Sequence, residues 1–270
     1  MNSIILTTLE LGLIYSLVVF SALLTSVLLK YDDLAIEASF SFGGATCASL
    51  LMHGVTPFLT PVIALCAGAF VGLSAGLLHT KLKLNNIITG IILIAGFFSL
   101  NLIIGGANLP LINVPTIFLN SPKLLILIFL IVIAFLIISW LLKTEVGFLI
   151  KASGTNSDLV ESLGKSSDFY KIITLMISNA LTALAGALFV QYTGFYSIWS
   201  GIGILVIALT GLIIAQMFSC KFGISLILGA IIYQMIITIT LTLDVPIELN
   251  KLITAILLIL LILLHRGKNA

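Results

Sequence analysis

GFLIKASGTNSDLVESLGKSSDFYKIITLMISNALTALAGALFVQ, residues 147–191, contains the longest polar interruption in a chain that otherwise consists almost wholly of apolar runs. Mixed charges, glycines and the signals of a short helix fill its first half, and a long apolar segment follows. Loops held by a rigid scaffold commonly carry functional contacts. The stretch therefore predicts a membrane protein that meets a partner outside the bilayer.

The composition is typical of a polytopic membrane protein. Of the 270 residues, 60% are hydrophobic and 8% are charged, whereas about a quarter of the residues in soluble domains are charged. A helix of roughly 20 apolar residues crosses the hydrocarbon core, so the chain divides into about nine spans, within a range of about eight to ten. The predicted fold is an all-α transmembrane bundle with spans at residues 4–29, 34–52, 60–79, 86–104, 123–142, 170–191, 201–218, 223–242 and 251–264.

The positively charged residues predict how these spans are oriented. If the spans alternate in direction, every Lys and Arg except Lys123 and Lys251 falls on the same side. An excess of Lys and Arg marks the cytoplasmic side. We therefore expect a multi-pass protein of the bacterial inner membrane with its N-terminus outside, its C-terminus in the cytoplasm and a cytoplasmic loop at residues 143–170.

The whole chain, residues 1–270, is expected to form a single transmembrane domain. Its longest polar stretch is far too short to bury a core of its own. The connection GGANLPLINVPTIFLNSP, residues 105–122, carries no charge. We expect it to return as a short helix at the outer surface.

The second span and a few isolated polar residues are candidates for a translocation pathway. The run SFSFGGATCAS, residues 39–49, places adjacent glycines and hydroxyl groups within a span. It predicts either a bend that lines a pore or a helix that packs closely on its neighbours. Amide side chains in other spans either bond helices together, which we favour, or contact a neutral or zwitterionic solute. The candidates are Ser39, Ser41, Gly43, Gly44, Asn101, Gln191 and Gln216.

Small residues recur every four positions in two further spans. Such stripes let two helices approach backbone to backbone. We interpret both stripes as packing surfaces. They consist of Gly68, Gly72 and Gly76 in the third span and of Ser178, Thr182 and Gly186 in the sixth.

Glu10 and Glu37 are the only carboxylates placed well inside apolar runs. A charge at the bilayer centre costs roughly 2.5–3.5 kcal/mol on insertion scales. Glu37 lies close to Asp32 and Asp33, so a solvated or amide-capped position at the inner interface explains it. Glu10 is expected to face water at the outer surface.

The sequence predicts no covalent chemistry. Gly164, Lys165 and Ser166 resemble the end of a phosphate-binding loop, but Leu159 stands where that loop needs its first glycine. The three histidines are scattered along the chain. We expect no catalytic residue, no metal site and no cofactor bound by this chain, and hence a protein that is not an enzyme.

A short helix is predicted inside the central loop. Thr155 and Asp158, each followed three residues later by an acidic side chain, are signals for a helix start, and Gly164 is a signal for its end. Leu159, Val160 and Leu163 give this helix an apolar side. Two helical turns are marginally stable in water, so burial in a partner's groove would stabilise the helix. A solvated surface helix is the alternative.

Two matches carry a resemblance to a known family. The first runs from KASGTNSDLVESLGK, residues 151–165, through Tyr170 and Lys171 to SNALTALAGAL, residues 178–188, and the second is DLAIEASFSFGGA, residues 33–45. They resemble the cytoplasmic signature and the second span of bacterial ABC importer permeases of the branched-chain amino acid and ribose class, in its small-solute or aromatic amino acid branch. Many members have an arginine before the loop, where this chain offers Lys143 and Lys151.

The resemblance implies a function and a set of partners. It implies a permease subunit that forms the pathway for a small polar organic solute, such as an amino acid. A second permease chain, most simply an identical copy, would pair with it in the bilayer, and ABC ATPase subunits would use ATP and Mg²⁺ below it. An extracytoplasmic solute-binding protein would deliver the solute, and nucleic acid plays no part. The residues implied to couple the permease to the ATPase are Gly154, Asp158, Leu159, Glu161, Leu163 and Gly164.

Two other classes of protein compete with this interpretation. A secondary transporter driven by an ion gradient would need no ATPase and predicts buried carboxylates or an unwound ion site. A membrane scaffold would explain the docking loop but not the polar and glycine-containing spans.

Overall fold

The computed structural model describes residues 2–119, 122–218 and 222–242, together with residues 249, 252, 253, 255, 256, 259 and 260. Eight helices in this part of the chain are long and apolar enough to cross a membrane. The predicted all-α membrane bundle is therefore confirmed. The ninth predicted span, residues 251–264, lies largely outside the described residues.

The first half of the chain forms four spans. The first begins as an α-helix and ends as a wider π-helical segment, after which Lys30 adopts a left-handed conformation with a φ of 53°. At the start of the fourth, the Asn85 side chain accepts a hydrogen bond from the backbone N–H of Ile87, which caps the helix. These elements are α1 (Asn2–Ala22), η1 (Leu23–Leu29), α2 (Ala35–Met52), α3 (Leu59–Thr80) and α4 (Asn86–Gly105).

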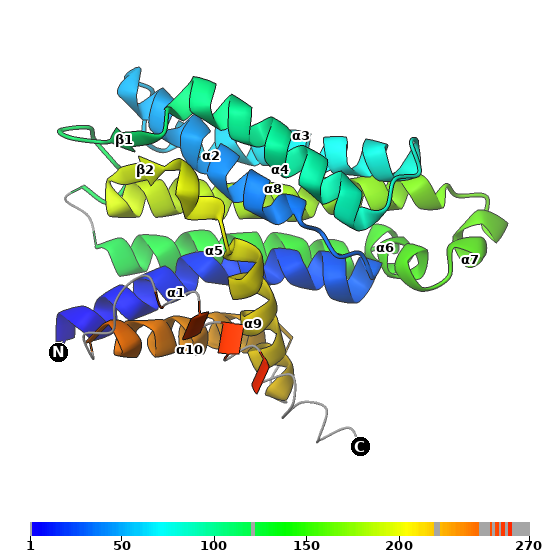
Figure 1. Cartoon of the computed structure of the whole chain (residues 1–270). Helices are drawn as coiled ribbons and strands as arrows, with labels where there is room; N and C mark the ends of the chain where they lie inside the picture. Colours follow the sequence, from blue (N-terminus) through cyan, green and yellow to red (C-terminus); the bar gives the residue numbers. More distant parts are fainter. Residues whose placement is uncertain are drawn as a thin grey trace.

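The second half contains the long central helix α8. Its elements are α5 (Lys123–Leu142), α6 (Glu145–Thr155), α7 (Ser157–Ser162), α8 (Ser167–Thr193), the 3₁₀-helix η2 (Ile198–Gly201), α9 (Ile204–Met217) and α10 (Phe222–Thr242). In Figure 1, α6 and α7 project from one end of the bundle, and the N-terminus lies at the opposite end. We call these the α7 end and the amino end.

A small two-stranded sheet lies at the amino end (Figure 1). Strand β1 (Asn108–Pro110) pairs with antiparallel β2 (Phe195–Ser197), and Asn108 stands opposite Ser197. The prediction of a short helix within residues 105–122 was therefore wrong, because residues 108–110 form a strand. Gly106 ends α4 with a φ of 67°, and the backbone of β1 finds its hydrogen-bond partners in another external connection rather than in a local helix.

The two predicted stripes of small residues pack on different neighbours, because the α3 stripe lies against α8 and the α8 stripe faces α1 and α2. A Cβ atom on Gly68 would meet Ala183 and the carbonyl oxygen of Asn179, and one on Gly72 would meet the carbonyl oxygen of Leu175. On the other helix, a Cβ atom on Gly186 would overlap the Phe40 carbonyl oxygen of α2. Both stripes are thus packing surfaces, as predicted, since only small residues permit this approach.

The helix break lies in the seventh span and not in the second. Helix α2 runs unbroken through both of its adjacent glycines. By contrast, η2 ends at Gly201, and α9 begins only after Gly203, whose φ is 91°. A left-handed φ favours glycine, which explains why the predicted continuous span at 201–218 is interrupted at its start.

Candidate functional site

Helices α6 and α7 form a helix pair that is fixed to the bundle by a small apolar core. Leu149, Ile150 and Ala152 of α6 are buried together with Val160 of α7 and Tyr170 of α8. Val160 has no exposed surface. The pair is therefore attached to the α7 end of α8 and not suspended on a loose loop.

The cap of α7 differs from the predicted caps. The Asn156 side chain accepts a hydrogen bond of 3.1 Å from the backbone N–H of Leu159. Thr155 instead ends α6 and bonds back to the carbonyl oxygen of Lys151 at 3.1 Å. The predicted starts at Thr155 and Asp158 were wrong because an asparagine between them is the better N-cap.

The outward side of α7 is exposed and mixed in character. Leu159 is 42% exposed and Leu163 is 54% exposed, and Asp158 and Glu161 are exposed beside them. Gly164 follows with a φ of 72° and donates its backbone N–H to the carbonyl oxygen of Glu161 at 2.9 Å. Five of the six residues implied for coupling thus lie on or next to one short helix. We call Asp158, Leu159, Glu161 and Leu163 the α7 surface.

Gly154, the sixth residue, lies in α6 and faces the bundle. A Cβ atom at this position would overlap the carbonyl oxygen of Leu28 and the backbone of Leu29 in η1. The helix pair therefore touches the first span as well as α8.

A buried polar layer crosses the bundle between α1, α2 and α8. Asn179 of α8 donates from Nδ2 to Oδ2 of Asp33 at 2.7 Å, and its Oδ1 accepts a hydrogen bond from the Ser39 hydroxyl. About one turn further along α8, the Thr182 hydroxyl donates to the Ser21 Oγ of α1 at 2.8 Å. These contacts satisfy side chains that would otherwise be costly inside a membrane protein.

Asp33 is the functional candidate that the sequence did not reveal. Its side chain is buried, and its Oδ1 accepts a hydrogen bond of 3.0 Å from the backbone N–H of Ala35. Burial raises the pKa of Asp33 to about 6, against the opposing effect of the bonds from Asn179 and Ala35. No signal in the sequence separates it from its exposed neighbour Asp32.

The candidate pathway residues of the second span divide into two groups. Gly43 lies against the backbone of Ala183, and Gly44 lies near Val190 and Tyr196. Ser39 contacts Asn179, and Ser41 donates to the carbonyl oxygen of Ile198 at 3.4 Å. The two glycines therefore occupy packing positions, whereas the two serines belong to the polar interior.

The three amide candidates lie in three different environments. Gln191 is buried at the amino end, where it donates to the Pro57 carbonyl oxygen at 3.0 Å and accepts from the Ile117 N–H at 2.9 Å. Gln216 is exposed on α9. Asn101 is buried on α4, and its Oδ1 has no hydrogen-bond partner among the described residues. The structure does not bring these three residues together.

The helix break places a carboxylate at the start of α9. The backbone N–H of Gly203 donates to Oε1 of Glu37 at 2.9 Å. Gly201 lies against the Ser41 hydroxyl and the Glu37 carbonyl oxygen, where a Cβ atom would not fit. A carboxylate beside a helix N-terminus is favourable, which accounts for the amide cap expected for Glu37.

Glu10 was predicted to face water, and this prediction was wrong. It is 3% exposed, and its Oε2 accepts a hydrogen bond of 2.8 Å from the Tyr192 hydroxyl. The ammonium group of Lys123 lies 5.1 Å from the centre of the Tyr192 ring. Tyr192 and Lys123 also line a hollow of about 670 Å³ at the amino end. This hollow is the largest among the pockets described.

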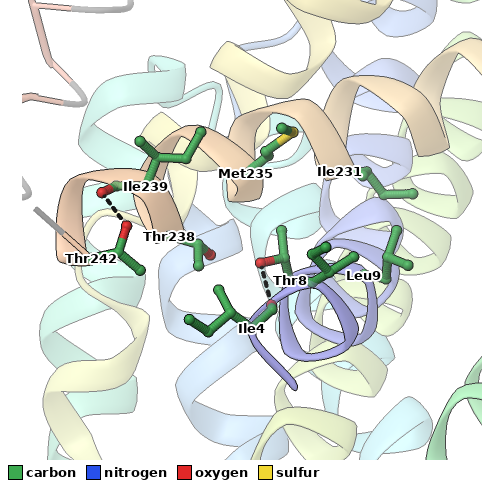
Figure 2. A pocket seen from close by; sticks show the side chains of 9 residues that line it. Ile4, Thr8, Leu9, Ile231, Met235, Thr238, Ile239 and Thr242 are labelled. Carbon is green, nitrogen blue, oxygen red and sulfur yellow. Dashed lines mark hydrogen bonds between the residues drawn. The ribbon is translucent and has the colours of Figure 1, made fainter. Parts of the chain in front are cut away.

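Figure 2 shows an apolar groove of about 250 Å³ between α1 and α10. Its walls include Ile4, Ile231 and Met235. The threonines that line it bond to their own helices, as Thr8 does to the carbonyl oxygen of Ile4 at 2.8 Å. The groove therefore offers no polar group suited to a polar solute.

An all-α membrane bundle with a buried polar layer and a helix pair projecting from one end fits the architecture of a membrane transport subunit. The chain belongs to the family described as branched-chain amino acid transport system / permease component, which matches residues 4–262. It is therefore the permease component of an ABC importer for a small solute, and it is not an enzyme. Members of this class work with ATPase partners.

Individual proteins support this assignment. The chain is 34% identical to a tyrosine transport system permease protein of Clostridioides difficile (strain R20291), over 94% of this chain and 89% of that protein. It is 26% identical to the galactofuranose transporter permease protein YtfT of Escherichia coli (strain K12), over 86% and 71%. A solved inward-facing structure of an ABC transporter described as metal-chelate type gives a TM-score of 0.54 at 15% identity, over 98% of this chain and 85% of that chain. At that identity, the last comparison shows the fold alone.

Proposed function

We propose that this permease moves an amino acid across the bacterial inner membrane and that the α7 surface docks on the ATP-hydrolysing subunit. The chain would lie with its N-terminus outside and the α7 end in the cytoplasm, as the distribution of lysines predicts. A second copy of the chain would complete the pathway, and an extracytoplasmic binding protein would deliver the solute. ATP and Mg²⁺ would be held by the partner, and this chain would bind no cofactor.

One observation carries the proposed coupling role. Val160 fixes α7 to the bundle, while Leu159 of the same helix and Leu163 directly after it are exposed at the end of the molecule. Exposed apolar side chains beside acidic ones are suited to a groove on a soluble partner, because their burial stabilises the complex. The contact of Gly154 with η1 then offers a path by which closure of the partner moves the membrane helices.

The choice of an amino acid is supported by the relatives. The relative with 34% identity is named for tyrosine transport, whereas the one with 26% identity is named for galactofuranose transport. The polar layer around Asn179 is also free of Lys and Arg side chains among the contacts described. Such a layer is compatible with a zwitterionic solute.

The coupling role is tested by purification of the tagged chain with its own ATPase in mild detergent. Leu159→Asp together with Leu163→Asp should reduce recovery of the ATPase by at least about tenfold, since charged groups would replace two buried anchors. Ile112→Asp is the control, because Ile112 is an exposed apolar residue, at 73% more exposed than either leucine, and lies in the connection between β1 and α5, away from α7. Equal recovery of the ATPase with the double variant and with the control would remove the docking role.

A further inference from the structure

A small cleft of about 30 Å³ lies between α2, α4 and the η2–α9 break. Glu37, Ser41 and Asn101 form its polar wall, and Phe98 and Ile202 lie on its apolar side. A cavity of this size holds about one water-sized group. We call it the Glu37–Asn101 cleft.

Asn101 gives this cleft an unsatisfied hydrogen-bond acceptor. The residue is 2% exposed, and its Oδ1 has no partner among the described residues. A buried polar atom without a partner typically costs about 1–3 kcal/mol. A donor supplied by a ligand would remove this cost, and the cleft is where such a donor can enter.

Three side chains bring hydrogen-bond acceptors to the cleft. Glu37 brings a negatively charged carboxylate whose Oε1 also accepts from the Gly203 N–H, Asn101 brings Oδ1 beside its NH2 donors, and the Ser41 hydroxyl donates to the Ile198 carbonyl oxygen and so presents its lone pairs. A primary ammonium group carries three N–H donors and one positive charge. It matches this set better than a sugar hydroxyl, which carries one donor and also needs to accept.

We infer that the Glu37–Asn101 cleft binds the primary ammonium group of the transported solute. The inference rests on the proposed function, and it assigns the residues that recognise an amino acid. The charge of the solute is offset by Glu37, and its N–H groups reach Asn101 and Ser41. A charged group buried in a membrane protein needs such a partner.

The rest of the solute lies outside the cleft, which is too small for it. Phe98 and Trp199 form an aromatic pair with ring centres 5.8 Å apart. Trp199 is 59% exposed and Ile202 is 45% exposed, so both present apolar surface beside the opening. A solute with an apolar or aromatic side chain would be favoured over a small polar amine.

Uptake by the complete importer tests the inference. The importer, reconstituted in vesicles with ATP inside, is given L-tyrosine, L-leucine, D-galactose or 3-(4-hydroxyphenyl)propionate, which is tyrosine without its amino group. We expect uptake of the amino acids to exceed that of the deaminated compound at least tenfold. Glu37→Gln and Asn101→Leu should each lower amino acid uptake by about tenfold or more, because each removes one partner of the ammonium group.

Two further variants separate recognition from folding. Asn101→Asp keeps an acceptor at the same place and should retain amino acid uptake. Ser99→Leu is the matched control, because Ser99 is exposed on the same helix two residues away. Undiminished amino acid uptake in both Glu37→Gln and Asn101→Leu, or uptake of D-galactose alone, would overturn the inference.

A binding measurement separates this inference from the proposed function. In the full chain in lipid nanodiscs, with Cys66 and Cys220 replaced by serine, an Ile202→Cys variant reacts with a maleimide. L-tyrosine or L-leucine should slow this reaction, and Asn101→Leu should abolish the protection. Protection without ATP-driven uptake of these amino acids would support the cleft and contradict the proposed amino acid transport. Amino acid uptake without this protection would support the proposed transport and contradict the ammonium site in the Glu37–Asn101 cleft.

Discussion

Asn179 of α8 donates a hydrogen bond of 2.7 Å to the buried carboxylate of Asp33, which lies in the connection between η1 and α2. The same amide accepts from Ser39 of α2. One side chain on the central helix therefore joins three segments of the chain. The carboxylate has no cationic partner in these contacts, so its burial depends on Asn179 and on the backbone N–H of Ala35.

Replacement of Asn179 by Leu should destabilise the protein strongly. The change keeps the branching of the side chain, although leucine is larger, but leaves Asp33 with one hydrogen bond and leaves the Ser39 hydroxyl without its acceptor. Removing one partner of a buried charge typically costs about 3–5 kcal/mol. Thermal unfolding in detergent should show a clear loss, whereas Asn108→Leu, on the exposed edge of β1, should change little. Similar midpoints for the two variants would show that the Asn179 contact contributes little.

The pH dependence of stability should report on Asp33. Its pKa is raised to about 6 from 3.8, so the folded state binds the proton more tightly than the unfolded state. The stability contributed by Asp33 is then greatest below about pH 4 and declines as the pH rises through 6, by about 3 kcal/mol for a shift of this size. The destabilisation by Asp33→Ala should therefore shrink between pH 4 and pH 7. A difference between wild type and variant that does not vary with pH would contradict the buried carboxylate.

The sequence predicted the parts of this fold that depend on local composition. The span lengths follow from apolar runs, and the spacing of four residues predicted that Gly72 lies in a packing surface, although not that this surface meets α8. Val160 and Leu163 were both assigned to an apolar side of the loop helix, yet only Val160 is buried. The sequence predicts the helix, but which side faces the protein depends on the position of α6 and α8.

The remaining features depend on contacts between distant segments. Asp33 is buried because the chain after η1 folds back onto Asn179, and Glu10 is buried because Tyr192 lies beside it. The pairing of β1 with β2 joins two external connections that are far apart in the chain. Local patterns such as charge or turn signals carry no information about contacts between distant segments, so the sequence placed Glu10 in water and predicted a local helix within residues 105–122.

Gly72→Ala tests the packing of α3 on α8. The added methyl group would overlap the carbonyl oxygen of Leu175, and overpacking of this kind costs about 1–3 kcal/mol. Gly96→Ala is the control, because a Cβ atom on Gly96 meets nothing within 4 Å. The control should be neutral or stabilising by up to about 1 kcal/mol, since alanine favours helix more than glycine. Equal thermal unfolding of both variants would contradict the close approach.

Gly154→Leu tests whether the contact between α6 and η1 transmits motion. The side chain would displace α6 from Leu28 and Leu29, whereas the exposed side chains of the α7 surface are not altered. We expect the ATPase to co-purify normally while solute uptake falls by at least about tenfold, because a small misplacement of a coupled element can cost about that much. Co-purification, ATP hydrolysis and uptake are measured on the same preparation. Unchanged uptake would show that the first span does not take part in coupling.

Glu161→Lys tests the charge of the α7 surface. Glu161 is exposed on α7, so reversal of its charge should leave insertion and stability within about 0.5 kcal/mol. If the residue meets a basic groove on the ATPase, the reversal places like charges in contact, which costs several kcal/mol at an interface. Uptake and solute-stimulated ATP hydrolysis should then fall together, and higher salt should partly restore them, since screening weakens the repulsion.

Asp32→Lys alters the net charge equally at an exposed position outside α7 and should leave both activities intact. Equal loss in both variants would assign the effect to net charge, and no loss in Glu161→Lys would place the docking contact on Leu159 and Leu163 alone.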